Sequence, residues 1–369
     1  MLFRSWTKLF YPEKYSCQGG KIVYMTLYSE INEQPEKIKS LLSSQRKVVE
    51  KIATEIRKRD IQYVFLAARG TSDNAGRYAN YLLGAQNGLP LALATPSLFT
   101  YYKQPPKLKN ALVVGISQSG QSPDIVSVLD EGRKQGCATL AITNEPNSPL
   151  TQSADYVIDI QAGAEKAVAA TKTYTTELMS IAMLSAALGE NKKHWEDLGK
   201  VAGWMKEVLK LNDDLAQIAQ RYRYMDQTIV LGRGFNYATA FEWALKLKEL
   251  TYINAEPYSS ADFAHGPIAM IEPGFPVLAV APKGKVFNSM LEMLKRLRED
   301  ISAELVVISN DKKALALAQV PLTIPVDMPE WISPLVSILP AQLFAYYLTL
   351  AKGFNSEQPR TIRKVTETK

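Results

Sequence analysis

The chain has 369 residues, 46% of them hydrophobic and 22% charged, which suits a globular protein with two domains rather than one ordinary core. Two cysteines and two histidines exclude a disulfide framework and a histidine-rich metal centre. The net charge of +6 is concentrated at the ends, because residues 1–24 carry +3 and residues 357–369 carry +2. A balance of +1 for the body argues against a nucleic-acid-binding surface.

Targeting signals are not evident in the sequence. No apolar run approaches the roughly 18 residues that cross a bilayer, and the opening MLFRSWTKLF lacks the uninterrupted apolar core of a secretory signal. We therefore expect a cytoplasmic protein without a membrane partner. Residues 1–24 are aromatic and basic without clear periodicity, so we interpret them as a leader or non-native extension, with an ordered N-terminal arm as the alternative.

Apolar segments alternate with helical patterns along the rest of the chain. From Pro35 to about Arg59, apolar residues recur at the spacing of a long amphipathic helix. Buried strands are expected at YVFLA (63–67), ALVVGIS (111–117), ATLAIT (138–143) and YVIDI (156–160). This alternation predicts an α/β fold in which helices cover both faces of a parallel sheet.

The same unit occurs twice in the sequence. Four landmarks recur at an offset of 164 to 166 residues: Arg69-Gly70 with Arg233-Gly234, Gly120 with Gly284, Asn144 with Asn310, and VIDI at 157–160 with TIPV at 323–326. Four matches in near-constant register predict two tandem three-layer αβα domains that arose by duplication, joined by a helical stretch from about 172 to 222.

The repeat sets the expected domain boundaries. Residues 25–210 hold the N-terminal helix and the first domain, and residues 211–356 hold the second. Residues 357–369 form a C-terminal tail without a strong periodic pattern, and covering a site is one reason for such a tail to carry Lys364.

Hydroxyl-rich turns follow two strands of the first copy, at Gly70-Thr71-Ser72 and at SQSGQS (117–122). In a parallel sheet, ligands bind beyond the carboxyl ends of strands, where helix N-termini offer free N–H groups. Hydroxyls and N–H groups suit a phosphate dianion, whereas plain helix capping would explain either cluster alone. The second copy has Lys283-Gly284-Lys285 at the matching position, so the predicted phosphate pocket belongs to the first copy.

Acid–base groups are concentrated in the second copy. Lys246 and Glu249 are three residues apart on an expected helix, so both can face one pocket, although a surface ion pair is the alternative. His265, in a loop before Gly266-Pro267, suits proton transfer near neutral pH, with a structural loop histidine as the alternative. His194, among lysines in NKKHWEDL, indicates a solvated helix face, and Cys137 in an apolar segment indicates a buried thiol.

These motifs together resemble a known family. The matching stretches are Gly70-Thr71-Ser72, SQSGQS (117–122), AVAATKTYTTE (167–177), LGRG (231–234), ALKLKEL (244–250), NAEPYSSADFAHGP (254–267) and EQPRTIRKVT (357–366). The chain from Met25 onward is similar to double sugar-isomerase (SIS) domain proteins. It resembles the isomerase half of glutamine:fructose-6-phosphate aminotransferase and, most closely, stand-alone isomerising glucosamine-6-phosphate deaminases.

The resemblance implies a role for each matching residue. The sugar phosphate would be held by the two hydroxyl turns, and the sugar would be lined by a third segment: Gly70, Thr71, Ser72, Ser117, Gln118, Ser119 and Ser122 in the turns, and Glu165, Ala169, Ala170 and Thr171 in the segment. Glu249 would move a proton between C1 and C2, with Lys246 assisting near the same carbon. His265 would open the sugar ring from a partner subunit, which implies a homodimer with shared active sites. Lys364 would contact the sugar carbonyl or form an imine with it.

Three positions depart from the aminotransferase pattern. Arg69 replaces a cysteine, Ala170 a serine and Ser122 a threonine. These departures favour the deaminase branch. About 60 residues precede the first strand, without an N-terminal cysteine, so glutamine hydrolysis within this chain is not expected.

The resulting hypothesis is an enzyme that converts glucosamine 6-phosphate and water to fructose 6-phosphate and ammonia, without a metal or redox cofactor. One alternative is a deglycase or isomerase for another phosphosugar amine, or ammonia-dependent synthesis in the reverse direction. An alternative of another class is a regulatory protein that senses sugar phosphates. Glu249, His265 and Lys364 together favour the enzyme.

Overall fold

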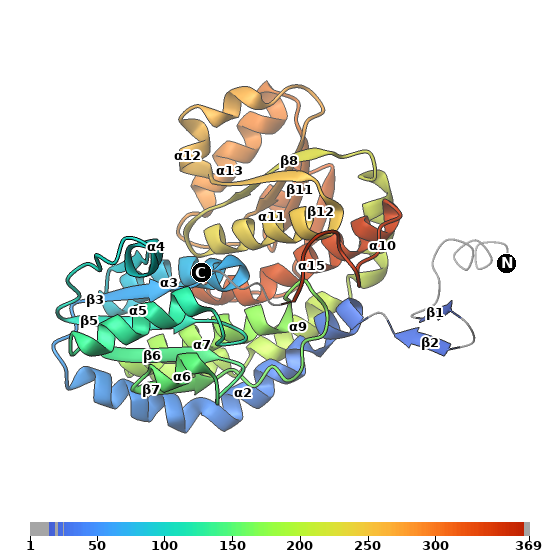
Figure 1. Cartoon of the computed structure of the whole chain (residues 1–369). Helices are drawn as coiled ribbons and strands as arrows, with labels where there is room; N and C mark the ends of the chain where they lie inside the picture. Colours follow the sequence, from blue (N-terminus) through green and yellow to red (C-terminus); the bar gives the residue numbers. More distant parts are fainter. Residues whose placement is uncertain (1–14, 19–20, 25, 365–369) are drawn as a thin grey trace.

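The computed structural model describes residues 15–18, 21–24 and 26–364. Two five-stranded sheets dominate it, and helices cover both faces of each (Figure 1). The strand order is β4-β3-β5-β6-β7 in the first sheet and β9-β8-β10-β11-β12 in the second, and all neighbours are parallel. Because the two orders match strand for strand, the predicted pair of duplicated αβα domains is confirmed.

The elements of the first domain begin with a long helix and end with a buried one. Its strands are β3 (Tyr63–Ala67), β4 (Leu91–Leu93), β5 (Ala111–Ile116), β6 (Ala138–Thr143) and β7 (Tyr156–Asp159). Its helices are α2 (Thr26–Arg57), α3 (Gly70–Asn87), α4 (Ser97–Thr100), α5 (Pro123–Lys134), α6 (Pro149–Gln152) and α7 (Lys172–Leu188). Three further helices, α8 (Lys192–Leu198), α9 (Val201–Leu209) and α10 (Asn212–Arg221), lead to the second domain.

The second domain repeats this order. Its strands are β8 (Gln227–Gly232), β9 (Asn254–Ser259), β10 (Pro276–Val280), β11 (Glu304–Ser309) and β12 (Val320–Thr323). Its α-helices are α11 (Tyr237–Thr251), α12 (Ser260–Ala264), α13 (Phe287–Lys295), α14 (Lys312–Leu317) and α15 (Ser333–Ala351). It also has three short 3-10 helices, η1 (Gly234–Asn236), η2 (Pro267–Met270) and η4 (Glu330–Ile332), and one π-helical turn, η3 (Arg296–Asp300), among the described residues.

Side chains of the central strands are buried on both faces, which explains their continuous apolar sequences. In β5, Leu112 and Val114 belong to the core shared by both domains, whereas Ala111 and Val113 belong to a separate core on the opposite face of the sheet. Successive side chains of a strand point to opposite faces, so a strand covered on both sides must be apolar at every position.

The edges of the sheets differ from the sequence-based expectation. β4 and β9 were not expected, because one has three residues and the other, NAEPYS, is polar and contains Pro257. The match of TIPV at 323–326 to a strand is wrong in register, since β12 ends at Thr323. The last bond from this segment to β11 runs from the Ile324 N–H to the Ser309 carbonyl at 2.8 Å, so the pairing stops before Pro325.

The first long helix starts nine residues earlier than expected from its apolar pattern. It begins at Thr26, and Pro35 lies inside it. The N–H groups of Thr26 and Leu27 donate to the Glu357 carboxylate at 3.0 and 3.3 Å, which satisfies the start of the helix. Proline removes one helical donor, and the Gln34 amide donates instead to the Ile31 carbonyl at 2.9 Å.

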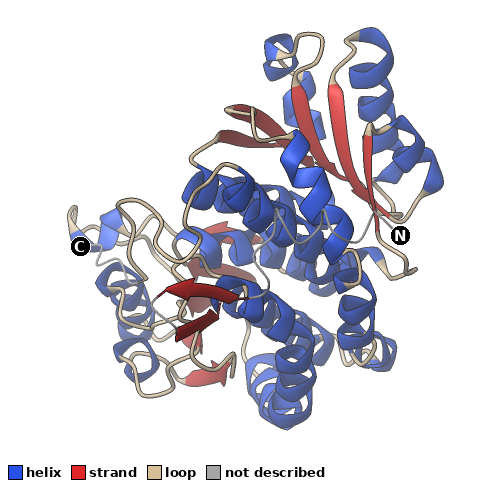
Figure 2. Ribbon diagram, turned by 90° about the vertical axis from the view of Figure 1, so that its right-hand side faces the viewer, coloured by secondary structure: helices blue, strands red, loops and turns tan. Residues whose placement is uncertain are grey.

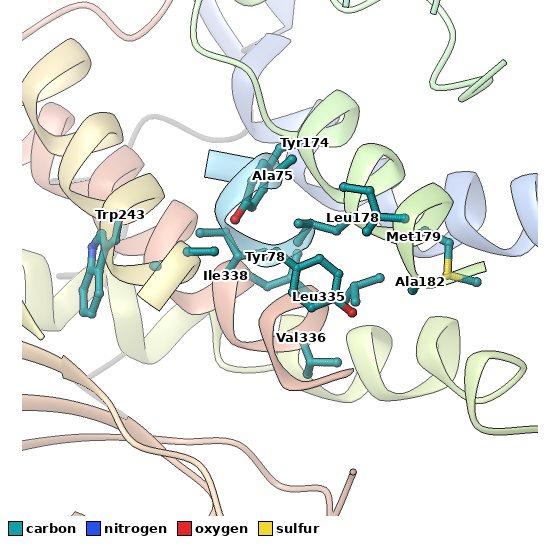
Figure 3. Close-up of a cluster of buried hydrophobic side chains, with 14 of the residues drawn as sticks. Ala75, Tyr78, Tyr174, Leu178, Met179, Ala182, Trp243, Leu335, Val336 and Ile338 are labelled. Atoms are coloured by element: carbon teal, nitrogen blue, oxygen red, sulfur yellow. The ribbon is translucent and has the colours of Figure 1, made fainter. Parts of the chain in front are cut away.

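The two domains share one helical core rather than being linked only by a connecting segment. Figure 2 shows helices in the space between the two sheets. Tyr78 of α3, Tyr174 of α7, Trp243 of α11 and Leu335 of α15 lie in this core (Figure 3). The Tyr78 hydroxyl donates to the Trp331 carbonyl at 2.9 Å, across the domain boundary. Apolar packing of this extent holds the two domains in a fixed relation.

Three expectations about single segments can be compared with the structure. Contrary to the expectation from apolar runs, Glu330–Ala351 is long and apolar enough to cross a membrane, but 89% of the tested window is buried inside the protein. His194 is half-buried rather than on a solvated face, and its ring centroid lies 4.7 Å from that of Trp331. Burial lowers the pKa of His194. Cys137 is buried, as expected, and its thiol donates to the Leu108 carbonyl.

Part of the predicted leader is described. Tyr15–Gln18 (β1) and Lys21–Tyr24 (β2) pair as an antiparallel hairpin, and in the described part of the chain they pair with no other strand. The remainder of the predicted leader, residues 1–14 and 19–20, lies outside the described residues.

Candidate active site

A cavity of about 310 Å³ lies at the carboxyl ends of β3 and β5, where it is bounded by both domains and by the C-terminal tail. It is lined by Arg69, Gly70, Thr71, Ser72, Ile116, Ser117, Gln118, Ser119, Ser122, Ile125, Glu165, Val168, Ala170, Thr173, Glu249, Ile362, Arg363 and Lys364. Most residues that the sequence singled out are therefore brought together, although they come from segments as far apart as residues 70 and 364.

The first hydroxyl turn connects β3 to α3. Gly70 has φ +53°, a left-handed conformation that favours glycine. Beside it, the Arg69 Nε donates to Asp124 Oδ2 at 2.8 Å and ties this turn to the start of α5. Arg69 lines the cavity and was not among the predicted site residues, although its position next to Gly70 could have indicated it.

The second hydroxyl turn connects β5 to α5. Gly120 has φ +60°, and a Cβ there would lie 2.1 Å from the Ser148 Oγ, so the turn requires glycine. The hydroxyl oxygens of Ser117 and Ser119 accept the N–H groups of Gly120 and Gln121 at 3.1 and 3.3 Å. These bonds leave each hydroxyl hydrogen available to a ligand oxygen.

Helix capping does not account for the last serine of this turn. Ser122 occupies the N-cap position of α5, but its side chain makes no capping hydrogen bond. The Asp124 carboxylate accepts the Ile125 N–H at 2.9 Å in the first turn of the helix. Ser122 lines the cavity, so plain helix capping does not explain this serine.

A buried lysine holds the carboxylate that α11 presents to the cavity. The Lys246 Nζ lies 2.6 Å from Glu249 Oε2, 3.4 Å from Glu242 Oε1 and 3.2 Å from Thr71 Oγ1. Burial lowers the lysine pKa, but the neighbouring carboxylates outweigh burial and leave the pKa above its usual value. Lys246 does not line the cavity, so it orients Glu249, whose side chain is 24% exposed, from behind.

Two further carboxylates lie beneath the cavity and were missed from the sequence. Glu242 accepts hydrogen bonds from Thr71 Oγ1 at 3.1 Å and from Asn74 Nδ2 at 2.8 Å. Burial raises its pKa to about 7. Glu177 accepts from the Ser72 hydroxyl at 2.8 Å, and burial raises its pKa to about 8. The available signal for Glu177 was a charged residue inside the otherwise uncharged helical run TYTTELMSIAMLSAAL.

The C-terminal tail contributes a lysine that is paired with Glu165. Lys364 Nζ lies 2.5 Å from Glu165 Oε2, and Glu165 also accepts the N–H groups of Thr171 and Thr173 at 2.9 and 3.1 Å. Burial raises the Glu165 pKa, but Lys364 and these hydrogen bonds outweigh it, and the pKa lies below its usual value. Glu165 is therefore a carboxylate in this ion pair.

The described part of the tail, up to Lys364, is anchored before it reaches the cavity. Glu357 caps α2, and the Arg360 N–H donates to the Tyr252 hydroxyl at 2.9 Å. The Arg360 guanidinium also lies over the rings of Tyr252 and Phe354, at 4.3 and 5.1 Å from their centroids. These contacts fix the approach of Ile362, Arg363 and Lys364, while residues 365–369 of the predicted tail lie outside the described residues.

Besides Lys246, three other predicted site residues do not line the cavity: Ala169, Thr171 and His265. Ala169 and Thr171 are buried next to it, each 1% exposed, and Thr171 acts through its N–H bond to Glu165. His265 is exposed at the end of α12 in the second domain, outside the set of lining residues.

Comparison with known proteins gives the class of this chain. The SIS domain family matches residues 57–187 and again residues 223–352. The chain therefore belongs to the SIS domain family and carries two copies of the domain.

Individual relatives narrow this class. Glutamine–fructose-6-phosphate aminotransferase [isomerizing] of Pyrococcus horikoshii is 32% identical over 354 residues, covering 94% of this chain and 58% of that protein. The protein of the same name from Aquifex aeolicus is 33% identical, covering 95% and 58%. The chain thus spans slightly under three fifths of the length of the curated relatives it matches.

Solved structures show the same fold over almost the whole chain. The C-terminal domain of glucosamine-fructose-6-phosphate aminotransferase from Francisella tularensis superposes with a TM-score of 0.79 at 27% identity, covering 91% of this chain and 99% of that one. Glucosamine-6-phosphate deaminase from Thermotoga maritima superposes with a TM-score of 0.77 at 20% identity, covering 93% and 100%. At that identity the second likeness concerns the fold alone.

Proposed function

We propose that this chain converts glucosamine 6-phosphate and water to fructose 6-phosphate and ammonia. The observation that carries the proposal is the single cavity in which two hydroxyl turns, the Glu249 carboxylate and the Lys364 ammonium meet. A phosphosugar needs an anion-binding end and a reactive end, and this cavity offers both. The names of the relatives, which are isomerising enzymes of amino and keto sugar phosphates, support the same substrate class.

The hydroxyl turns form the phosphate end. Ser117, Ser119 and Ser122 lie at the junction of β5 and α5, where hydroxyl donors and the positive end of the α5 dipole converge. Hydrogen bonds to a phosphate dianion are charge-assisted, and several neutral donors can hold it without a salt bridge. Thr71 and Gln118 extend the same donor set.

Glu249 is the acid–base group of the proposed reaction. In the open-chain sugar it takes the proton from C2, which gives an enolamine, and returns a proton to C1, which leaves an imine at C2. Water adds to that imine, ammonia leaves, and the C2 ketone of fructose 6-phosphate remains. The ion pair with Lys246 fixes the position of the carboxylate, while its partial exposure to the cavity gives it access to the substrate.

Lys364 faces the carbonyl end of the sugar. The ion pair with Glu165 holds the Lys364 amino group where it can donate a hydrogen bond to the sugar carbonyl and polarise it. We propose carbonyl polarisation as the role of Lys364, because it keeps the ion pair with Glu165 intact. An imine between Lys364 and the sugar carbonyl is the alternative.

Ring opening needs one more proton-transfer group near the sugar. His265 is exposed and outside the cavity lining of its own chain. We propose that the chain forms a homodimer in which His265 of the partner subunit reaches the cavity, because closed two-fold pairs are the commonest oligomers.

The test is ammonia release from a panel of 6-phospho-amino sugars, with the ketose product identified by chromatography. Glucosamine 6-phosphate should give equal amounts of ammonia and fructose 6-phosphate. The Glu249→Gln variant, purified in the same way, is the control for contaminating enzymes. Binding of sugar phosphates without turnover would replace the proposal with a sensor function. Turnover of another phosphosugar amine alone would change the assigned substrate.

A further inference from the structure

The second domain has a loop at the position of the candidate phosphate loop 117–122, although Gly284 does not share the left-handed φ of Gly120. Gly234 follows β8 with φ +59°, as Gly70 follows β3 with φ +53°. The loop 281–286 connects β10 to α13, as the loop 117–122 connects β5 to α5. By the offset of the repeat, Lys285 and Val286 stand where the first domain has Gln121 and Ser122.

A side chain of the protein itself occupies this second loop. The Glu330 carboxylate accepts the Lys285 N–H on Oε2 at 2.8 Å and the Val286 N–H on Oε1 at 3.3 Å. A Cβ on Gly284 would lie 2.1 Å from the Glu330 Cδ, so the carboxylate lies directly against the glycine backbone. Two adjacent N–H groups and an open glycine face therefore bind a planar anion at the carboxyl end of β10.

The position of Glu330 in the fold corresponds to the segment that lines the first cavity. Glu330 begins η4, directly before α15, and α15 is the counterpart of α7. Val168 and Ala170 lie in the segment directly before α7 and line the cavity of the first domain. The same structural segment therefore borders an open cavity in one domain and supplies an anion to the loop in the other.

A second carboxylate in this segment makes a different contact. Asp327 pairs with the Lys283 side chain at 2.9 Å and contacts the Asn310 amide at 3.4 Å. Its described bonds go to side chains, whereas Glu330 binds the loop backbone. The two acidic residues carry the same charge, but only Glu330 binds the N–H groups of the loop. Removal of Asp327 is therefore a matched control for removal of Glu330.

We propose that loop 281–286 is a second anion cradle, of the kind that takes inorganic phosphate or a phosphate monoester, and that Glu330 keeps it closed. The chain thus has two phosphate loops by duplication but leaves only one open to substrate. The inference rests on the proposed function in one respect, which is the assignment of loop 117–122 as the phosphate loop. The carboxylate seated in loop 281–286 is an independent observation.

The experiment counts phosphate sites. Inorganic phosphate is titrated by calorimetry and equilibrium dialysis into the full-length parent, Glu330→Ala and Asp327→Ala, with folding checked by circular dichroism. Glu330→Ala should bind one more phosphate per chain than the parent does. This extra site should be at least about tenfold tighter than any weak second site of the parent, because the vacated N–H groups again have a charged acceptor. Asp327→Ala makes the same change in net charge and should gain none.

The outcomes separate this inference from the proposed function. One site in the parent and two in Glu330→Ala support both, while none in the parent and one in Glu330→Ala support the cradle alone. Equal numbers in the parent and in folded Glu330→Ala, or an equal gain in Asp327→Ala, overturn the inference. If Glu330→Ala does not fold, phosphate should raise the melting temperature of Glu330→Ser more than that of the parent, and equal shifts overturn it.

Discussion

Glu177 is completely enclosed beneath the cavity, and its protonation should govern part of the pH dependence of stability. Its Oε1 accepts the Ser72 hydroxyl, while its Oε2 has no hydrogen-bond partner within the described residues. Burial raises its pKa to about 8 against the opposing Ser72 hydrogen bond. The nearby carboxylates of Glu165 and Glu242 contribute to this rise, and Lys364 opposes it. At pH 7 the side chain is therefore the neutral acid.

The magnitude follows from the ionisation of Glu177 in the two states. The unfolded carboxyl ionises near pH 4.5 and the folded one near pH 8, so the folded protein holds an extra proton between these values. Its stabilising contribution is fully present below pH 4.5 and is lost as the pH rises to about 8. At about 1.4 kcal/mol per pH unit, the loss between pH 5 and 8 is on the order of 4 kcal/mol.

Glu177→Gln is the variant that isolates this effect, because glutamine keeps the shape and cannot ionise. Urea unfolding of parent and variant, followed by circular dichroism at pH 5 to 8, gives the difference in the free energy of unfolding. The variant should gain on the parent by about 3 to 4 kcal/mol across this range, on top of a constant offset for the buried amide. Glu165→Gln is the control, because the lowered pKa of Glu165 predicts a flat difference above pH 5. A flat difference for Glu177→Gln as well would refute the reasoning.

Three further predictions concern the site. Ser119→Ala should weaken binding of sugar phosphates by about 1.5–3 kcal/mol in a calorimetric titration, since one charge-assisted hydrogen bond is lost; unchanged affinity would mean that the phosphate pocket lies elsewhere. Glu249→Gln should lower kcat by ~10²-fold or more with substrate affinity largely kept, and near-parental turnover would remove Glu249 as the base. Mixing Glu249→Ala with His265→Ala protein should restore activity in hybrid dimers, whereas no recovery after confirmed subunit exchange would argue against a shared site.

The central parts of both sheets could be predicted because their signal is local. The segments 63–67 and 138–143 coincide with β3 and β6, since strands buried on both faces are apolar at every position. The repeat added the topology, because the same landmarks returned after 164 residues. At the edges, β9 pairs on one side only and tolerates polar residues and Pro257, so its sequence resembles a loop.

The sequence predicted which residues line the cavity more fully than it predicted the pKa values of the carboxylates near it. Hydroxyl turns at strand ends, and Glu249 three residues after Lys246, are patterns within short segments. Glu242 lies on the same helix, but its raised pKa depends on burial against Thr71 and Asn74 of the other domain. Burial arises only when the domains pack, so no local pattern distinguishes such a carboxylate from a solvated one.

The sequence by itself determined the duplicated α/β architecture and the hydroxyl turns, because alternation, periodicity and turn residues act over a few neighbouring positions. Only the tertiary structure decided which distant groups meet. Glu357 caps a helix that begins 331 residues earlier, and Lys364 pairs with Glu165 across 199 residues. Likewise, loop 281–286 is closed only because the chain returns Glu330 to it. Contacts of this kind depend on the packing of whole domains, which sets both the distances between charges and their exposure to water.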